Sequence, residues 1–467
     1  MDLDKLFYPS SIAVIGASPR LGEGKLPYFQ LLKRTGFQGA LYAVNPAHKE
    51  IDGIKVFPSI DDLPEGVDLA IVQVPVRRAL EVVTAAQKKG IKFVHFFTSG
   101  FSEIGDIELE RAMVKQARQG GTRIIGPNCI GVLCTESKVT FNYNPLLEQA
   151  GPGTIAFLGQ SGGVSLNFLR MAQSRKLELN KAISYGNQID LGAHDYIEYF
   201  GRDDAIKVIT AYIEDVKDGR AFLEVLKVTT PKKPVIILRG GATAQGARAA
   251  ASHTGAICGP QYIFSAVMRQ SRCIEVQTLE QMLDVVTLVT SAKVPRGSRV
   301  GFLGAGGGTS VLFTDLAALH GFSLPELEAS TQERINEKIS RINTSTANPV
   351  DLGAYGRDLQ IMVHTIKVMD SDKNIDLIIP FFYLEYIRTL QPDQLERVIK
   401  LMTETFPGME KPVIPIFSRF SKDDLQLEER KIQLFSAFRD AGLPVFETMP
   451  EALFTIRSVL KWKYLSH

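Results

Sequence analysis

Cysteine is scarce in this chain. The four cysteines, Cys129, Cys134, Cys258 and Cys273, are widely scattered, and no Cys-x-x-Cys pair occurs among the 467 residues. So few separated thiols exclude a disulfide scaffold. We therefore expect a reducing compartment, the cytoplasm.

Long apolar runs and an excess of one charge are also absent. No stretch approaches the roughly 20 apolar residues that cross a bilayer. The first residues, Met1-Asp-Leu-Asp-Lys-Leu, carry acids where a signal peptide is basic. Lys and Arg number 53 against 51 Asp and Glu, a formal net charge of +2. The sequence thus predicts neither secretion nor membrane anchoring, and its charge gives no reason to expect nucleic-acid binding.

The chain does contain a regular alternation of short apolar runs and amphipathic stretches, which is typical of parallel sheets covered by helices. At roughly 100–200 residues per domain, this length corresponds to two to four domains. Pro and Gly at 151–153 and 293–298 mark two linkers. We expect three tandem βα domains over residues 1–150, 151–294 and 295–467.

The predicted elements follow from these runs. Strands are expected at residues 11–17, 40–44, 68–74, 91–97, 154–158, 208–213, 235–238, 273–276, 299–303, 376–380 and 412–416. Helices are expected at 108–117, 279–291 and 451–462, among others.

The first strand ends in Gly16-Ala17-Ser18, and Lys25 precedes the next helix. Glycines at such a turn let the backbone approach a phosphate, whose charge the helix start and the lysine favour. The second strand ends in Asn45-Pro46, where a nicotinamide-binding domain places an acid for the ribose. This favours coenzyme A, whose ribose is phosphorylated, over NAD; its pantetheine arm could pass Val74-Pro75. The alternative is a glycine turn without a ligand.

A second strand, turn and helix contain Gln160-Ser161-Gly162-Gly163. Backbone N–H groups beside a serine hydroxyl at a helix start form an anion site. The same residues fit the Gly-x-Ser-x-Gly nucleophile elbow of hydrolases. That alternative requires a later acid and histidine, and it requires the elbow to lie in a single hydrolase sheet.

His253 is the one histidine of seven that stands among glycines and hydroxyls, in Ser252-His253-Thr254-Gly255. The small residues on both sides predict a mobile, open loop around an imidazole that can attack phosphorus. Glu214 follows the strand at 208–213, at the edge where such sheets place their sites. Accepting a hydrogen bond from one ring nitrogen, it would free the other. The alternatives are a surface histidine without a role and a solvated acid.

These residues together resemble the α subunit of ADP-forming acyl-CoA synthetases, relatives of succinyl-CoA synthetase. The resemblance covers nearly the whole chain in collinear order. The matching segments are Ile15-Gly-Ala-Ser18, Asn45-Pro46, Gly126-Pro-Asn128-Cys129-Ile-Gly131, Gly159-Gln-Ser-Gly-Gly163, Ser184-Tyr-Gly186-Asn187-Gln-Ile-Asp190, Tyr212-Ile-Glu214, Asp218-Gly-Arg220, Ser252-His-Thr-Gly255, Gly304-Ala-Gly-Gly-Gly308 and Asn348-Pro-Val-Asp351.

The resemblance implies an α/β fold, with a Rossmann-like CoA-binding domain followed by two flavodoxin-like domains with parallel sheets. It implies that His253 is transiently phosphorylated and that Glu214 orients it. The residues implied to bind CoA are Gly16, Ala17, Ser18, Lys25, Asn45, Pro46, Val74, Pro75, Ser99 and Asn128. Those implied to bind phosphate are Gln160, Ser161, Gly162, Gly163, Ser252, Thr254, Gly255, Gly306, Gly307 and Gly308. No metal ligand is predicted.

Two features depart from the family pattern. Ala242 stands roughly where the family often has a basic residue. Three βα domains also use up the length, which leaves no ATP-grasp module. The resemblance therefore implies that ATP or ADP binds with Mg²⁺ mainly on an ATP-grasp β subunit, in an α₂β₂ assembly.

The expected activity is the interconversion of acyl-CoA, ADP and phosphate with a carboxylic acid, CoA and ATP. It would proceed through an acyl phosphate and phosphohistidine 253. The alternatives are a CoA-binding regulatory relative that has lost catalysis and an NAD-dependent oxidoreductase.

Overall fold

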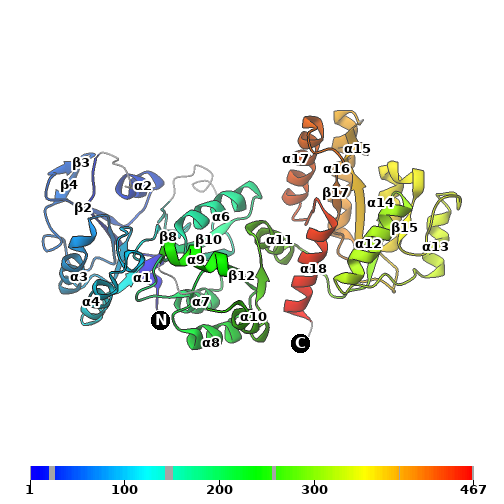
Figure 1. Cartoon of the computed structure of the whole chain (residues 1–467). Helices are drawn as coiled ribbons and strands as arrows, with labels where there is room; N and C mark the ends of the chain where they lie inside the picture. The colour runs from blue at the N-terminus through cyan, green and yellow to red at the C-terminus, as the bar shows by residue number, and fades with distance from the viewer. Residues whose placement is uncertain (1, 20–26, 142–150, 255–258, 389, 465–467) are drawn as a thin grey trace. The chain divides into compact units, whose positions relative to one another are not determined.

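The computed structural model describes residues 2–19, 27–141, 151–254, 259–388 and 390–464, with the backbone alone for 252–254. The chain forms two compact units, Met1–Leu279 and Glu280–His467. Unit 1 contains two sheets and unit 2 contains a third (Figure 1). The predicted α/β class is confirmed, and the domain division at residues 151 and 295 stays a prediction. None of the described helices is both long and apolar enough to span a membrane.

Sheet 1 has the strand order β3-β4-β2-β1-β5-β6-β7 and is parallel apart from the short β3–β4 pair. All five residues of β1 are buried, as expected for a central strand covered on both faces. The strands are β1 Ser11–Ile15, β2 Ala40–Val44, β3 Glu50–Ile51, β4 Ile54–Phe57, β5 Leu69–Val72, β6 Phe93–Phe96 and β7 Arg123–Ile125. The helices are α1 Asp4–Phe7, α2 Tyr28–Thr35, α3 Ala79–Lys88 and α4 Ile107–Arg118, with short 3₁₀ turns η1 Val76–Arg78 and η2 Ser102–Ile104.

Sheet 2 has the order β13-β12-β11-β9-β10-β8. Its strands are β8 Gly131–Cys134, β9 Ile155–Gly159, β10 Leu179–Ser184, β11 Val208–Ile213, β12 Val235–Arg239 and β13 Ile274–Val276. Its helices are α6 Gly162–Ser174, α7 Ala193–Arg202, α8 Gly219–Thr229, α9 Ala244–Thr254 and α10 Gln261–Gln270. The sheet is mostly parallel, as expected, and only the edge strand β8 runs antiparallel, to β10. β8 belongs to the stretch assigned to the first domain, so that stretch completes the second sheet.

The segment that joins the two sheets depends on a close backbone approach. Gly131 has φ +89°, and a Cβ there would lie 2.5 Å from the His95 ring. The buried ring donates from Nε2–H to the carbonyl oxygen of Cys129 at 3.0 Å. Burial lowers the pKa of His95 to about 4. A neutral imidazole therefore fills the space that glycine leaves.

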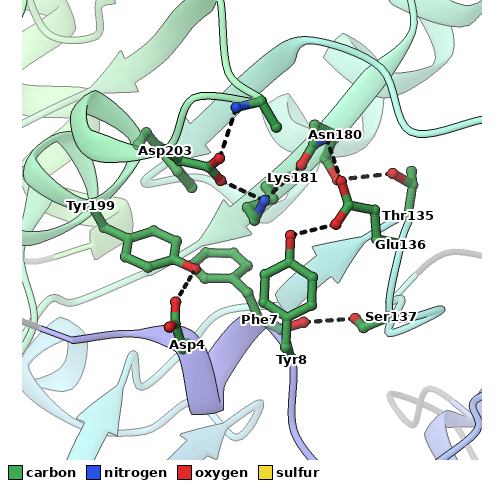
Figure 2. Close-up of polar contacts among 12 residues, drawn as sticks. Asp4, Phe7, Tyr8, Thr135, Glu136, Ser137, Asn180, Lys181, Tyr199 and Asp203 are labelled. Atoms are coloured by element: carbon green, nitrogen blue, oxygen red, sulfur yellow. Dashed lines mark hydrogen bonds and ion pairs between the residues drawn. The ribbon is translucent and has the colours of Figure 1, made fainter.

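The N-terminal segment precedes sheet 1 in sequence but packs on sheet 2. The ring of Phe7 stacks on that of Tyr199 in α7, with centroids 5.2 Å apart. Figure 2 shows Tyr8 beside it, donating from its hydroxyl to Glu136 at 2.7 Å. Lys181 of β10 is fully buried, 4.9 Å from the centre of the Tyr8 ring and 2.7 Å from a carboxylate oxygen of Asp203 (Figure 2). Residues from the start of the chain therefore pack on sheet 2, although none of its strands comes from there.

Unit 2 is built on a four-stranded sheet with the order β15-β14-β16-β17. The strands are β14 Val300–Gly304, β15 Val350–Asp351, β16 Leu377–Tyr383 and β17 Ile416–Ser418. The helices are α11 Leu279–Thr290, α12 Gly307–Leu319, α13 Ala329–Asn336, α14 Leu359–Met369, α15 Leu384–Arg388, α16 Pro392–Thr405, α17 Leu425–Asp440 and α18 Met449–Lys463, with 3₁₀ turns η3 Gly353–Arg357 and η4 Phe406–Gly408. β17 begins at the end of the strand predicted over 412–416. Pro412 and Pro415 have no N–H to donate to a ladder, which explains the late start.

Candidate functional site

The carboxyl edge of sheet 1 contains a cavity of about 670 Å³. Five of the residues predicted to bind CoA line it: Gly16, Asn45, Pro46, Val74 and Pro75. Gly16 has φ +88°, and a Cβ there would lie 3.1 Å from the Val74 side chain and 3.2 Å from the Gln73 carbonyl oxygen. The first strand thus turns at a point where only glycine leaves the cavity open.

Asn45 holds the floor of this cavity in place. Its side-chain Nδ2 donates to the Ala17 carbonyl at 2.8 Å, and its Oδ1 accepts from Ala47 N–H at 2.9 Å. The amide therefore ties the end of β2 to the turn after β1. Asn45 thus occupies, with a structural role, the position where a nicotinamide-binding domain has its ribose acid.

The other predicted CoA residues that the structure describes are not among those lining this cavity: Ala17, Ser18, Ser99 and Asn128. The Ser18 carbonyl accepts from Gln30 Nε2 at 2.9 Å, and Lys25 lies outside the described residues. Ser99 is exposed after β6. Asn128 has φ +57° and donates from its N–H to the Thr98 carbonyl at 3.0 Å.

Sequence reasoning missed the basic side chains of the cavity, which come from the 3₁₀ turn and helix after β5. Arg78 and Lys88 both line it, and Arg78 is 2.7 Å from Glu81. Neither stands in a motif. The one signal in the sequence is that they belong to the helical segment that directly follows a strand of the same sheet.

At the carboxyl edge of sheet 2, Ser161 begins α6 as its N-cap, with Oγ accepting from Val164 N–H at 3.4 Å. A Cβ on Gly162 would lie 3.1 Å from Ile130, whereas Gly163 faces open space apart from the Ser161 Oγ at 3.9 Å. The first N–H groups of a helix have no intrahelical acceptor, so this turn suits an anion. Ser161 has ordinary extended backbone angles, φ −103° and ψ 128°. This differs from the strained turn of a nucleophile elbow and disfavours the hydrolase alternative.

Gln160 uses both ends of its amide inside the protein. Its Oε1 accepts from the backbone N–H of Glu214 at 2.8 Å and of Asp215 at 3.1 Å. Its Nε2 donates to the Asp215 carboxylate. The side chain is 3 % exposed. In this structure the Gln160 amide is therefore directed at the acids after β11, and its phosphate contact stays a prediction.

Asp215 is a second buried acid at this edge. Its carboxylate accepts from Gln188 Nε2 at 2.5 Å and lies 2.9 Å from Lys217 Nζ. Together with Gln160 it joins the ends of β9, β10 and β11. Sequence reasoning assigned it no role, although it directly follows Glu214 at a strand end.

Glu214 is 7 % exposed and accepts a hydrogen bond from the Tyr212 hydroxyl at 3.1 Å. Gly240, which follows β12, packs against this pair, because a Cβ there would collide with the Tyr212 hydroxyl oxygen. The acid predicted to orient His253 therefore lies beside the start of the chain segment that carries His253.

The expectation of a loop around His253 is wrong for the described part, since residues 244–254 form helix α9. Five alanines in this segment explain the helix, because alanine has the highest helix propensity. α9 packs against η2 of sheet 1. The backbone of Ser252, His253 and Thr254 belongs to α9; their side chains and Gly255 lie outside the description.

Unit 2 has a comparable glycine turn at Gly306, Gly307 and Gly308, before α12. Gly306 has φ +112°, and its N–H donates to Asp351 Oδ1 at 2.7 Å. The Thr309 and Tyr383 hydroxyls are 2.5 Å apart beside it. Among the residues that the structure describes, no cluster of three or more His, Cys, Asp or Glu could hold a metal ion.

Two family models match successive parts of the chain. Residues 10–135 match the CoA binding domain, and residues 152–289 match the succinyl-CoA ligase like flavodoxin domain. These two domains together define an acyl-CoA ligase of the succinyl-CoA ligase type.

Similarity to individual proteins shows which family within this class the chain belongs to. The chain is 35 % identical over 419 residues to the acetate–CoA ligase (ADP-forming) II subunit alpha of Pyrococcus furiosus, covering 89 % of this chain and 90 % of that protein. It is 35 % identical over 330 residues to the I subunit alpha of the same organism, covering 69 % and 71 %. The dinucleotide forming acetyl-coenzyme A synthetase 1 of Ca. Korarchaeum cryptofilum, solved with phosphate and ADP, superposes with a TM-score of 0.83 at 28 % identity, covering 99 % and 97 %. The chain belongs to the family of ADP-forming acetate–CoA ligases and aligns with their α subunits.

Proposed function

We propose that this chain is the α subunit of an ADP-forming acyl-CoA synthetase. Phosphate attacks the acyl carbon of acyl-CoA, which forms an acyl phosphate and releases CoA as the thiol. His253 then attacks phosphorus, which gives phosphohistidine and the carboxylate. ADP takes the phosphoryl group to become ATP and restores the histidine. All three steps are reversible, so the same residues can also activate a carboxylate at the expense of ATP.

The placement of α9 carries this proposal. The segment begins at Gly240, against Tyr212 and Glu214 of sheet 2, and α9 packs against η2 of sheet 1. A phosphorylated side chain must meet an acyl phosphate near the CoA thiol and then leave for ADP. A helix between the edges of the two sheets suits the first of these encounters.

The cavity of sheet 1 suits CoA. Gly16 lets the backbone approach a phosphate, and the basic Arg78 and Lys88 line the cavity together with the acids Asp61 and Glu81. Val74 and Pro75 offer an apolar wall for the pantetheine arm. Ser161, Gly162 and Gly163 would hold the inorganic phosphate with the N–H groups of α6, and the turn at Gly306–Gly308 offers a second such site.

A partner subunit completes the reaction in this proposal. The two Pyrococcus furiosus relatives named above are α subunits, and we infer an ATP-grasp β subunit that binds ADP or ATP with Mg²⁺, in an α₂β₂ assembly. The cytoplasm is the proposed compartment, because the described cysteines Cys129, Cys134 and Cys273 are unbridged thiols. The substrate is a small acyl-CoA, of the acetate type.

The test is intact-mass and peptide mapping after incubation with Mg²⁺, phosphate and a panel of acyl-CoAs at neutral to alkaline pH. We expect an acid-labile gain of one phosphoryl group at His253, which disappears in His253→Ala and remains in the control His194→Ala. No label with any acyl-CoA, even with the partner subunit present, would overturn the synthetase and leave a CoA-binding relative.

A further inference from the structure

Two neighbouring side chains hold Glu214, the acid predicted to orient His253. Its Oε1 accepts from the Tyr212 hydroxyl at 3.1 Å, while its backbone N–H donates to Gln160 at 2.8 Å. Both Glu214 and Gln160 are buried, at 7 % and 3 % exposure. The acid is therefore fixed at its backbone by one neighbour and at its carboxylate by another.

The backbone contact is itself braced. Gln160 Nε2 donates to Asp215, which also accepts from Gln188 Nε2 and pairs with Lys217. These residues follow three adjacent parallel strands, β9, β10 and β11. The Gln160 side chain is thus part of a hydrogen-bond network that joins three strands, and it moves little. The backbone of Glu214, which donates to Gln160, therefore keeps its position whether or not the histidine is near.

With its backbone fixed, the Glu214 side chain can still rotate its carboxylate, and the hydrogen bond from Tyr212 restricts this rotation. The phenol belongs to β11, and it lies against Gly240, where a Cβ would collide with the hydroxyl oxygen. The hydroxyl is thus confined between the acid and the first residue after β12. With Oε1 engaged by Tyr212, the carboxylate has a defined orientation when a ring N–H approaches.

We propose that Tyr212 is a positioning residue for phosphorylation of His253, acting by fixing the carboxylate of Glu214. The inference rests on the proposed function. A carboxylate already oriented accepts one ring N–H without rearrangement, which keeps the other ring nitrogen directed at phosphorus. Tyr212 itself donates no proton and forms no bond to phosphorus. Its contribution disappears if the carboxylate is absent.

The matched pair Tyr212→Phe and Tyr185→Phe tests this. Tyr212 is half-buried and Tyr185 is fully buried at the same edge, but the Tyr185 hydroxyl has no hydrogen-bond partner among the described residues. With whichever acyl-CoA labels the wild type, we expect Tyr212→Phe to slow phosphohistidine formation about tenfold without changing KM for the acyl-CoA. Tyr185→Phe should leave the rate unchanged. Loss of one hydrogen bond to a charged group corresponds to about this factor.

A double-mutant cycle separates positioning from packing. In a Glu214→Gln background, Tyr212→Phe should cause no further loss of rate, since the carboxylate it orients is gone. ³¹P NMR of the denatured protein should show one phosphohistidine isomer in the wild type and a mixture of isomers in Tyr212→Phe. Equal slowing in both backgrounds, or a rate equal to that of wild type in Tyr212→Phe, would overturn the inference. An unlabelled wild type would instead overturn the proposed function.

Discussion

Two strand–turn–helix pieces of this chain, one in each unit, share a design and differ in chemistry. β9 and β14 both have five residues and end on glycine, and α6 and α12 both have 13 residues. Phe157 stacks on Phe168 at 4.1 Å, and Phe302 stacks on Phe313 at 3.9 Å. The same packing thus sets the angle between strand and helix in both turns.

The neighbouring strand makes the difference. Glu214 lies three residues beyond Ala211, the partner of Leu158 in β9. Tyr383 lies three residues beyond Pro380, the partner of Leu303 in β14. One turn therefore faces a carboxylate and the other a phenol. The two glycine turns are thus alike in backbone, and the residue on the adjacent strand gives each a different side chain.

The shared packing gives the largest expected effect. Phe168→Ala and Phe313→Ala each remove a fully buried ring, and each should cost about 3–5 kcal/mol of unfolding free energy. By calorimetry, the first should lower the melting transition of unit 1 and the second that of unit 2. Leu312→Ala, at a side chain 64 % exposed, is the control and should change little. If either ring deletion shifted both transitions alike, the two pieces would not be independent.

The second largest expected effect is a difference between the two units in how their stability responds to acid. Burial lowers the pKa of His95 in unit 1 from 6.5 to about 4. Between pH 6.5 and pH 4, His95 is protonated in the unfolded chain and neutral in the folded chain. The free energy of unfolding of unit 1 therefore decreases as the pH is lowered, by up to about 3 kcal/mol. In unit 2 a hydrogen bond from Lys431 holds the pKa of Glu428 below its ordinary 4.5. The stability that this bond adds is lost only at lower pH.

Thermal melting between pH 7 and pH 4.5 checks this order. Unit 1 should weaken first, and His95→Gln should flatten its pH dependence even where it lowers the transition at pH 7. A parallel decline of wild type and variant would assign the acid sensitivity to other groups.

The smallest expected effect concerns the hydrogen bonds that Asp351 makes to the glycine turn of unit 2. Asp351 Oδ1 accepts from the N–H groups of Gly306 at 2.7 Å and Gly353 at 2.8 Å. Asp351→Ala removes both acceptor contacts and should cost unit 2 about 2 kcal/mol. Asp351→Asn keeps an oxygen and should cost less. Chemical denaturation compares the two variants, and equal losses would show that charge rather than the hydrogen bond holds the turn.

The sequence predicted those parts of the structure that depend on local pattern. Apolar runs ending in glycine located β1, β9 and β14, and the glycine turn after β1 does border a cavity. Helix α9 was missed because its alanines form no apolar face, so periodicity gave no signal where propensity did. The bonds from Gln160 to Glu214 and Asp215 could not be predicted, since the partners lie more than 50 positions away. Strands β8 and β10 pair with each other and neither was predicted, since the paired residues lie some 50 positions apart.

The docking of the N-terminal segment has a consequence for synthesis. Asp4 accepts a hydrogen bond from Tyr199, a residue made 195 positions later. At roughly 5–20 residues per second, the ribosome reaches Tyr199 roughly 10–40 s after Asp4. During that interval Leu3, Leu6 and Phe7, which end fully buried, lack the surface of sheet 2 that covers them. Asp4 and Phe7 therefore leave the ribosome well before the residue that they contact in the folded protein, Tyr199.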